Sequence, residues 1–379
     1  MSSLVTTLYP SVDLIDSVVF KEINSEENIY FSKSFLKAFE TSNPQIEFKY
    51  ISISGADKKT IALVLVQVIS LNVEGMLKNI KVTHLIRKGL GLLFCNEHIK
   101  IMFCGNVFLS GEHGICTSEK ISQKDIYSEI GTALDAVAAN TKPMHAIFIK
   151  DFKFASLVHA RQFLNFGYSE IKVEPNMIIK LKPEWKNFND YKDTLKSKYR
   201  VKANRADSKS SNLETCLFSN RDFETYKHEL QALYQNTIDK ASFNAQVLNL
   251  DTYSHLSLFL KENFIVKGYF LENRLVGFLT ALVNDNTLDA HFIGLDYELN
   301  KSHAIYPRIL NDYIRIGIEK QVSSINLGRT ASEIKTTIGA SPLELNCYIK
   351  HKSTFLNSLV KPFLRRIKIK EFKQHSPFK

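Results

Sequence analysis

The sequence predicts an α+β protein in which each of two similar halves builds helices around a mixed sheet. The chain has 379 residues, which is more than one ordinary domain contains. The expected order of helix, strands, helix, strand, helix and strand occurs twice along the chain, without any repeat of residues. In the second half, three consecutive strands are joined by hairpin-length loops, which indicates an antiparallel meander.

The composition is typical of a soluble globular protein, with 44% hydrophobic residues. The start of the chain lacks the basic and apolar pattern of a signal peptide. The longest apolar run, Ile61 to Leu71, is about half as long as a membrane-spanning helix. Five scattered cysteines without a Cys-x-x-Cys pair predict reduced thiols, a cytoplasmic location and no metal site.

In the first half we expect a serine-capped helix at 32–41, followed by strands at 46–54 and 59–71 with a turn between them. Next come a strand at 99–109, helices at 122–140 and 155–166, and strands at 145–152 and 171–181. Gly167 is the expected C-cap of the helix at 155–166. Residues 72–98 are apolar, basic and glycine-containing, which fits an insertion that either lies on a lipid or covers a site.

Pro183 and Trp185 mark the expected boundary to the second half. Here the sequence predicts a long basic helix at 189–207 and helices at 222–239 and 251–263. The meander strands follow at 264–271, 274–283 and 288–296. The predicted order ends with a helix at 302–321, a strand at 324–328, a short helix at 332–338 and a strand at 343–350. We therefore expect an N-terminal domain at 1–182 and a C-terminal, catalytic domain at 183–352.

The remaining residues, 353–379, are expected to form a basic amphipathic tail. Residues 361–379 carry seven of the chain's basic residues and one acid, so this segment holds +6 of the net charge of +10. Apolar side chains recur there at three-and-four spacing, at Phe355, Leu356, Leu359, Val360, Phe363, Leu364 and Ile367. This pattern predicts a helix that binds an anionic membrane surface, although Pro362 would bend it. The alternatives are a helix packed on the body, a disordered end, or binding of nucleic acid or an acidic carrier protein.

The segment INLGRTASEIKTTIGASP, from Ile325 to Pro342, carries a resemblance to a known family. Together with PNMIIKLKPEW and DYKDTLKSKYR, it is similar to the tandem GCN5-related N-acetyltransferase (GNAT) fold of the Fem-type peptidoglycan-bridge aminoacyltransferases and related bacterial lipid-amine N-acyltransferases. The matching residues are Tyr306, the run Leu327-Gly328-Arg329, Lys335 and the pair Gly339-Ala340. The resemblance implies two tandem GNAT-like acyltransferase domains, with an acyl thioester as cosubstrate and no bound cofactor.

The chain departs from that family at the start of the helix after the meander. Acetyl-coenzyme A enzymes of this fold hold the pyrophosphate on a glycine loop at this point, through backbone N–H groups and the helix dipole. The corresponding segment, YELNKSHA from Tyr297 to Ala304, has no glycine. A thioester on acyl carrier protein and an aminoacyl-tRNA therefore stand beside coenzyme A as expected donors.

The candidate catalytic residues of the second half lie on the last meander strand and the following helix. His291 and Asp289 fall on one face by alternation, and a histidine beside a carboxylate is a suitable general base near neutral pH. Tyr306 is a candidate acid for the leaving thiolate. The alternatives are a hydrogen-bonded sheet histidine and a core tyrosine.

The candidate donor-binding residues of this half surround the next strand. Arg329 can hold a phosphate or carboxylate with two hydrogen bonds, and Lys335 is a further phosphate candidate. Gly328 and Ser302 complete the expected donor-binding set. The alternatives are an ion pair that braces the loop for Arg329 and a solvated helix face for Lys335.

A second cluster of candidates lies in the first half. Glu112 and His113, in the sequence SGEHG, are flanked by glycines that let the backbone approach a ligand closely. We assign them as catalytic candidates and Asn106 as a binding candidate. The alternative is a polar hairpin loop.

These observations predict an N-acyltransferase that moves an acyl group from a thioester to an amine. The expected acceptor is a lipid amine, such as a sphingoid-type base or an amino-sulfonate lipid, on the inner face of the membrane. One alternative is a Fem-like ligase that uses aminoacyl-tRNA to extend a peptidoglycan precursor. Another is a non-catalytic protein that binds a lipid or a carrier.

Overall fold

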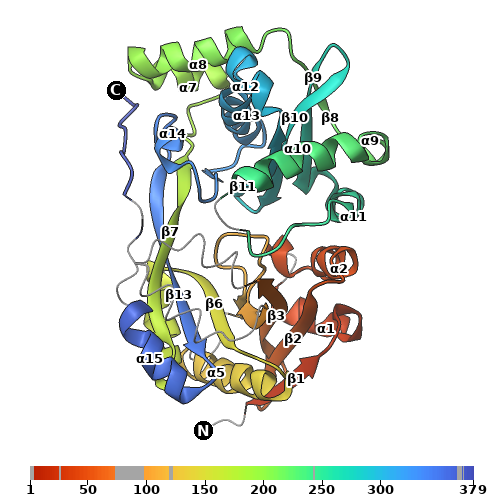
Figure 1. Ribbon diagram of the computed structural model, residues 1–379, viewed down its shortest axis with the longest axis vertical. Helices are drawn as coiled ribbons and strands as arrows, with labels where there is room; N and C mark the ends of the chain where they lie inside the picture. The colour runs from red at the N-terminus through yellow and green to blue at the C-terminus, as the bar shows by residue number, and fades with distance from the viewer. Residues whose placement is uncertain are drawn as a thin grey trace. The chain divides into compact units, whose positions relative to one another are not determined.

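The protein is represented by a computed structural model, which describes residues 4–24, 27–72, 98–118, 123–241, 244–364, 369 and 371–379. It divides into two compact units (Figure 1). Unit 1 contains Met1–Glu174, Ser242–Leu248 and Glu344–Ile369, and unit 2 contains Pro175–Ala241, Asn249–Leu343 and Lys370–Lys379. Two strands, β7 (Ser169–Lys180) and β13 (Ser341–His351), supply residues to both units. Domain bounds at 1–182, 183–352 and 353–379 remain a proposal.

The strands of unit 1 form both antiparallel and parallel pairs. They are β1 (Val5–Tyr9), β2 (Glu47–Ser54), β3 (Thr60–Asn72), β4 (His98–Cys104), β5 (Ile115–Thr117) and β6 (Ala146–Lys153), together with parts of β7 and β13. Neighbours from β1 to β4 pair antiparallel, β4 and β6 pair parallel, and β13 pairs antiparallel with β6. The strands at 46–54 and 59–71 are thus confirmed, whereas β4 ends at Cys104 instead of 109. The apolar insertion proposed for 72–98 falls on 73–97, outside the described residues.

The helices of unit 1 include those expected at 32–41, at 122–140 and after 353, whereas the short helices at 12–14, 17–22 and 29–31 were not predicted. The helices of this unit are η1 (Val12–Leu14), α1 (Ser17–Glu22), η3 (Ile29–Phe31), α2 (Lys33–Ser42), α5 (Gln123–Asn140), η4 (Phe154–Ser156), α6 (Leu157–Ala160), η5 (Arg161–Phe166) and α15 (Thr354–Leu364). Ser32 caps α2, as predicted, by accepting a hydrogen bond from Phe35 N. The prediction of a single helix at 155–166 is wrong, because that stretch is one short α-helix between two 3-10 helices. It does end at Gly167, which has a φ of +83°.

The core of unit 1 lies between α5 and the sheet. Four aliphatic side chains of α5 are buried there, namely Ile126, Ile130, Leu134 and Val137. They recur at helical spacing, as expected for a helix that buries one face. Their partners include Val64 and Val66 from the centre of β3, a strand whose side chains are buried on both faces.

The strands of unit 2 contain the predicted meander. β9 (Phe264–Leu271), β10 (Arg274–Asn284) and β11 (Thr287–Leu295) pair antiparallel in sequence order. Glu272 and Asn273 both have positive φ, as the tight hairpin between β9 and β10 requires. β12 (Ser324–Asn326) pairs parallel with β11 and antiparallel with β7. The edge strand β8 (Glu214–Leu217) was not predicted, because its four side chains are all exposed and show no alternation.

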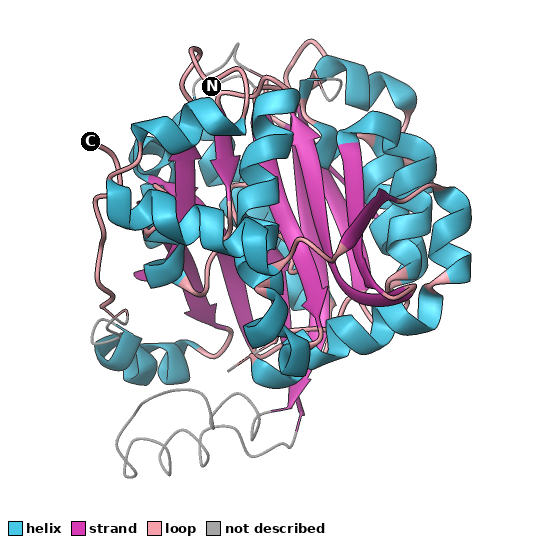
Figure 2. Ribbon diagram, turned by 90° about the horizontal axis from the view of Figure 1, so that it is seen from above, coloured by secondary structure: helices cyan, strands magenta, loops and turns pink. Residues whose placement is uncertain are grey.

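Helices lie against the strands of unit 2 (Figure 2). They are α7 (Phe188–Thr194), α8 (Ser197–Lys209), α9 (Asn220–Thr225), α10 (Lys227–Lys240), α11 (Asp251–Leu260), η6 (Lys261–Asn263), α12 (Tyr297–His303), α13 (Ile305–Glu319) and α14 (Ser332–Thr336). Ile305, Ile309 and Tyr313 of α13 share a buried cluster with α7, α8 and one face of the meander. On the other face of the meander, α10 packs closely on β11 at Gly294. A Cβ on Gly294 would lie 2.8 Å from the backbone of Leu233 on α10.

Three long helices expected in unit 2 are each divided in two. The predicted helix at 189–207 is broken at Leu195, whose ψ of 142° is extended and whose side chain is 1% exposed. The helix at 222–239 is interrupted at Tyr226, between α9 and α10. The helix at 302–321 is preceded by α12, and Ala304 separates the two with a left-handed φ of 50°. At Leu195 the burial of an apolar side chain outweighs local helix propensity, which is why periodicity alone did not show this end.

Among the helices that the structure describes, none has the length and apolarity needed to cross a bilayer.

Candidate functional site

The centre of unit 2 contains a place where two parallel strands part. β11 and β12 pair at Thr287↔Ser324, Leu288↔Ile325 and Asp289↔Asn326. Beyond that point β11 continues to Leu295, whereas the chain after β12 stays with β7 through hydrogen bonds of Met177 with Leu327 and Gly328. From Ala290 onward, this edge of β11 therefore has no strand paired with it within the described part of the chain. An edge of this kind offers backbone N–H and C=O groups to an extended ligand.

His291 lies in a β-bulge at this parting. The pair Leu279↔Ile293 is followed by Ala281↔Ala290, so His291 and Phe292 together stand opposite the single residue Thr280. The hydroxyl of Thr280 donates to the carbonyl of Phe292 at 2.8 Å, which fastens the bulge. Bulges commonly turn a side chain toward a site. The sequence placed His291 on a regular strand, and simple alternation cannot show such a bulge.

The face of β11 that carries His291 is covered by α10 and α11. His291 Nδ1 lies 3.2 Å from the hydroxyl oxygen of Tyr253, a residue of α11 that is fully buried. Burial raises the pKa of Tyr253 well above its usual value, so this phenol keeps its proton. When Nδ1–H donates to Tyr253, the basic lone pair of the imidazole is on Nε2.

Asp289 is the second predicted member of this site. It pairs with Leu282, which lies on the same face of β10 as Thr280, so Asp289 and His291 share a face as expected. Its Oδ1 accepts a hydrogen bond from Asn326 Nδ2 at 2.8 Å. Asn326 in turn accepts from Gly328 N at 2.9 Å, and this contact fixes the end of β12. The side chains of Asp289 and Asn326 thus span the parting.

The turn after β12 holds two further predicted residues, Gly328 and Arg329. Gly328, Thr330 and Ala331 all have left-handed φ values, of 68°, 62° and 47°. For Thr330, which is β-branched, this conformation costs about 1–3 kcal/mol, and strain of this kind gathers at ligand sites. Arg329 lies within the turn and is half-buried.

Lys335 lies beneath this turn. It is 5% exposed, and Nζ donates to the carbonyl oxygens of Leu327, Gly328 and Arg329. An ammonium group has three N–H donors, and each of them has a carbonyl acceptor here. This geometry favours a role in holding the turn over the predicted contact with a phosphate.

Tyr306 and Ser302 lie at the junction of α12 and α13. Tyr306 packs against the buried cluster on the α13 side of the sheet, and burial raises the pKa of its phenol, with Tyr297 as a second cause. Its backbone N–H donates to Asn300 Oδ1 at 2.8 Å. Ser302 is exposed on α12 and donates to Leu299 O at 3.0 Å. In the first turn of α13, the backbone amide of Tyr306 is therefore already bonded to the side chain of Asn300. This is the position at which acetyl-coenzyme A enzymes of this fold have their glycine loop.

A pocket of about 730 Å³ opens beside these residues, between α8, α12, α13 and α14. Figure 1 shows α8 next to α12 and α13. Its basic lining residues are Lys202, Arg205 and Lys209 of α8, Lys301 of α12 and His375 of the C-terminal segment. Glu333 is the acidic residue among those that line it. The sequence predicts α8 as part of a basic helix, and no local signal placed its basic residues around a cavity.

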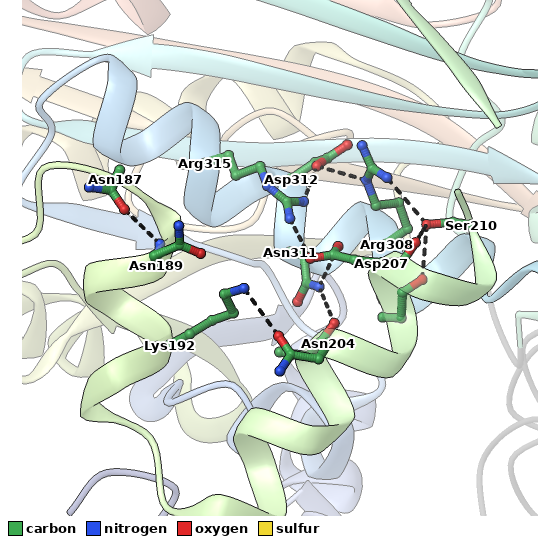
Figure 3. A network of polar contacts seen from close by, with 12 residues as sticks. Asn187, Asn189, Lys192, Asn204, Asp207, Ser210, Arg308, Asn311, Asp312 and Arg315 are labelled. Atoms are coloured by element: carbon green, nitrogen blue, oxygen red, sulfur yellow. Dashed lines mark hydrogen bonds and ion pairs between the residues drawn. The ribbon is translucent and has the colours of Figure 1, made fainter. Parts of the chain in front are cut away.

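A buried ion network fastens α8 to α13 behind this pocket (Figure 3). Arg315 bridges the two helices, with Nη1 2.6 Å from Asp312 Oδ1 and Nη2 2.6 Å from Asp207 Oδ2. Asp312 also accepts from Arg308, Lys267 and Tyr269 and is 0% exposed. Burial raises the pKa of Asp312, but Lys267, Arg308 and Arg315 lower it by more, so the net shift is downward. Asn311 ties Asp207 to the same helix.

The predicted residues of the first half belong to unit 1. Asn106 is 2% exposed, and its Oδ1 accepts from Phe108 N at 3.0 Å. Burial raises the pKa of Glu112, which accepts a hydrogen bond from Ser156 at 2.9 Å. The ring of His113 lies 4.0 Å from that of Tyr30. These three residues lie in the loop that follows β4.

The loop after β4 covers the end of the parallel pair β4–β6, which corresponds in unit 1 to the pair β11–β12 of unit 2. Lys150, the residue after the pair Cys104↔Ile149, donates to the carbonyls of Asn106 and Leu109 at 2.8 and 2.7 Å. Asp151 is fully buried, has a φ of +67° and accepts from Gly111 N. The place that is open beside β11 in unit 2 is therefore filled by the protein's own loop in unit 1.

Within the described residues, no group of three or more histidine, cysteine, aspartate or glutamate side chains has the arrangement of a metal site.

No protein-family model matches the sequence, and no curated protein sequence matches it either. Solved structures do match. One is FemX, with 8% identity, a TM-score of 0.56 and coverage of 92% of this chain and 99% of that chain. The chain has the tandem GNAT fold.

Two further structures support this assignment. The tandem GNAT protein from the clavulanic acid biosynthesis pathway has 7% identity and a TM-score of 0.52, covering 93% of this chain and 99% of that chain. The C-terminal domain of a putative lysylphosphatidylglycerol synthetase from Agrobacterium fabrum has 8% identity and a TM-score of 0.52, covering 90% and 95%. The predicted fold class, two tandem GNAT-like domains, is thus confirmed. At these identities the likeness concerns the fold.

Proposed function

We propose that the protein is an amine N-acyltransferase whose active site lies in unit 2, at the parting of β11 and β12. The observation that carries the proposal is His291 in the bulge, together with the open edge of β11 and the bond between Asp289 and Asn326 across the parting. The acyl arm of the donor lies along β11 in extended form and pairs with its backbone. In unit 1 the corresponding place is filled by the loop after β4, and this supports placing the active site in unit 2.

The chemistry assigns one role to each side chain. The amine nitrogen attacks the thioester carbonyl, so that a C–N bond forms and the C–S bond breaks. His291 Nε2 accepts the proton that the amine loses, and Asp289 stabilises the resulting imidazolium. Tyr306, which burial keeps protonated, donates a proton to the leaving thiolate from the α13 side. Arg329 is the candidate for orienting the donor.

For the donor we propose a thioester of coenzyme A or of acyl carrier protein. The tandem GNAT protein of the clavulanic acid pathway is described as solved without AcCoA, and the naming of this thioester for that protein supports a thioester donor here. The second candidate is an aminoacyl-tRNA, as in a Fem-like ligase that extends a peptidoglycan precursor. The fold likeness to FemX and the exposed basic side chains Lys198, Lys202 and Arg205 of α8 favour it.

For the acceptor we propose a lipid amine at an anionic membrane surface on the cytoplasmic side. α15 supports membrane binding, because Phe355, Leu359 and Phe363 are 71%, 44% and 41% exposed. The putative lysylphosphatidylglycerol synthetase is named for a lipid product, which supports a lipid acceptor. A protein that only binds a lipid or a carrier is the alternative that the following experiment excludes.

The test measures acyl transfer to sphinganine and to other amine lipids in mixed micelles, with acyl-CoA, acyl carrier protein thioester and aminoacyl-tRNA as separate donors. Thioester use releases free thiol, whereas aminoacyl-tRNA use is abolished by ribonuclease. His291→Ala should lower kcat by about 10²- to 10⁴-fold, because it removes the base. His303→Ala is the matched control and should retain full activity, since that histidine contacts Asn212 on the surface. Equal activity of the wild type and His291→Ala would refute the site, and no turnover with any donor would refute the enzyme.

A further inference from the structure

Thr280 lies opposite the bulge that carries His291, and it fixes the direction of one hydrogen bond there. The residue is 0% exposed, and its Oγ1 lies 2.8 Å from the carbonyl oxygen of Phe292. A carbonyl oxygen can only accept a hydrogen bond, so the Thr280 hydroxyl must be the donor. A threonine hydroxyl has a single proton. Because that proton is used on Phe292, the Thr280 oxygen can only accept from any further neighbour.

The phenol of Tyr253 is such a neighbour. Burial, and after it Tyr234, raises the pKa of this phenol, whereas a side-chain hydrogen bond with Thr280 lowers it. The phenol therefore stays protonated and has one proton to donate. If that proton pointed at His291, the hydroxyl oxygens of Tyr253 and Thr280 would face each other without a proton between them. The hydrogen bond with Thr280 therefore takes its proton from Tyr253.

His291 completes this chain of hydrogen bonds. Its Nδ1 lies 3.2 Å from the hydroxyl oxygen of Tyr253. Since the phenol donates to Thr280, its oxygen can only accept from the imidazole, and Nδ1 must carry a proton. In a neutral imidazole with a proton on Nδ1, the basic lone pair is on Nε2.

We infer that Thr280 and Tyr253 are positioning residues, which hold His291 in the tautomer with the proton on Nδ1 and the lone pair on Nε2. The carbonyl of Phe292 sets the direction of all three hydrogen bonds, so the bulge determines the tautomer of the side chain that it carries. The inference rests on the proposed function, because it concerns the residue assigned there as the base. Both residues act through His291 and not on the substrate.

The tautomer decides whether His291 can accept the proton of the amine. With the proton on Nδ1, Nε2 is the acceptor, and the imidazolium that forms keeps its Nδ1–H bond to Tyr253. In the opposite tautomer Nε2 already carries a proton, and the lone pair of Nδ1 is engaged by the phenol. In catalytic triads, a histidine held in the wrong tautomer lowers kcat by about 10⁴-fold.

The first experiment observes the tautomer by NMR of the full-length protein labelled with ¹⁵N-histidine. At about pH 8, where an unperturbed imidazole is neutral, the shifts of the two ring nitrogens show which one carries the proton. The signals of His291 are those that are absent from the spectrum of His291→Ala. The wild type should carry the proton on Nδ1, and so should Thr280→Ser, which keeps the hydroxyl. In Thr280→Val the phenol loses its acceptor and donates to His291, so the proton should move to Nε2.

The second experiment separates this role from a merely structural one. Thr280→Val should lower kcat for acyl transfer by about 100-fold and leave KM within about 3-fold, because His291 is then held in the wrong tautomer. Adding Tyr253→Phe removes the phenol that holds it there, so kcat of the double variant should recover to within about 10-fold of the wild type. A loosened bulge cannot explain this recovery, because the Phe292 carbonyl lacks its donor in both variants.

Tyr313→Phe is the matched control. It removes another buried phenol, one that donates to the backbone carbonyl of Thr280 at 3.0 Å, and it should change neither the tautomer nor kcat. A wild-type His291 with its proton on Nε2 overturns the inference, and so does a double variant no more active than Thr280→Val. The wild-type spectrum decides the matter even if Thr280→Val fails to fold. A proton on Nδ1 in a protein without transfer activity would refute the proposed function alone.

Discussion

Asp312 shows how a single buried residue holds the wall of the pocket between α8 and α13 in place. Three cations, Lys267, Arg308 and Arg315, contact its carboxylate, and Arg315 continues to Asp207 on α8 (Figure 3). A buried carboxylate is tolerated only when it is paired, and removing it leaves the cations without compensation. The position of α8, and with it that of Lys202 and Arg205, depends on this network.

We expect Asp312→Asn to lower the free energy of unfolding by about 3–5 kcal/mol, because it leaves a buried cluster of like charges. Urea denaturation at pH 7 measures the change. The control is Asp251→Asn, which breaks the exposed pair of Asp251 with Lys227 and should cost at most about 1 kcal/mol. Equal effects of the two variants would contradict the assignment.

The same residue predicts a dependence on pH. The pKa of Asp312 is lower in the folded protein than in the unfolded chain, so its stabilising contribution is complete above the unfolded value of about 3.9. It is lost as the pH falls through the lower folded value. The stability difference between the wild type and Asp312→Asn should therefore be constant from pH 7 to about 5 and shrink below about pH 4. A difference that already disappears near pH 6 would contradict this prediction.

At the scale of elements, glycines set how closely the helices approach the sheet. Gly294 of β11 lies against α10, and a Cβ there would come within 2.8 Å of the Leu233 backbone and 2.2 Å of Phe278. This contact seats α10 on the strand that carries His291. Gly131 of α5 is tight as well, but each of its three nearest atoms belongs to the ring of Phe166.

We expect Gly294→Ala to cost about 1–3 kcal/mol or more, because backbone must move to admit the methyl group. Gly131→Ala should cost less, since the Phe166 ring can shift and alanine favours a helix interior by about 1 kcal/mol. Thermal and urea unfolding of both variants measure the order. A larger loss for Gly131→Ala would contradict the packing argument.

At the scale of the whole molecule, the residues beyond 352 serve both units. α15 and Glu344–Ile369 belong to unit 1, whereas Lys370–Lys379 belongs to unit 2 and carries Phe378 and His375. Truncation at Ser353 would therefore remove part of the pocket wall along with α15, so it cannot test membrane binding alone. Substitutions on the exposed face of α15 avoid this problem.

We expect the triple variant Phe355→Ser, Leu359→Ser and Phe363→Ser to lose sedimentation with anionic phosphatidylglycerol vesicles. These side chains are exposed, so the melting temperature should change little, whereas the apolar area offered to the bilayer falls sharply. The control is Val201→Ser, which removes an exposed apolar residue on α8. Sedimentation equal to that of the wild type would refute membrane binding through α15.

The sequence by itself determined the meander and the order of helices and strands in the two halves, because hydrophobic periodicity and hairpin-length loops are local properties of the chain. It also placed Asp289 and His291 on one face of a strand. The tertiary structure alone decided the bulge at His291, the parting at Asp289↔Asn326 and the three carbonyl acceptors of Lys335. It alone brought His375 beside Tyr199 of α8, 176 positions away in the chain. Such features depend on which residues meet across long sequence separations, and no pattern within one segment encodes them.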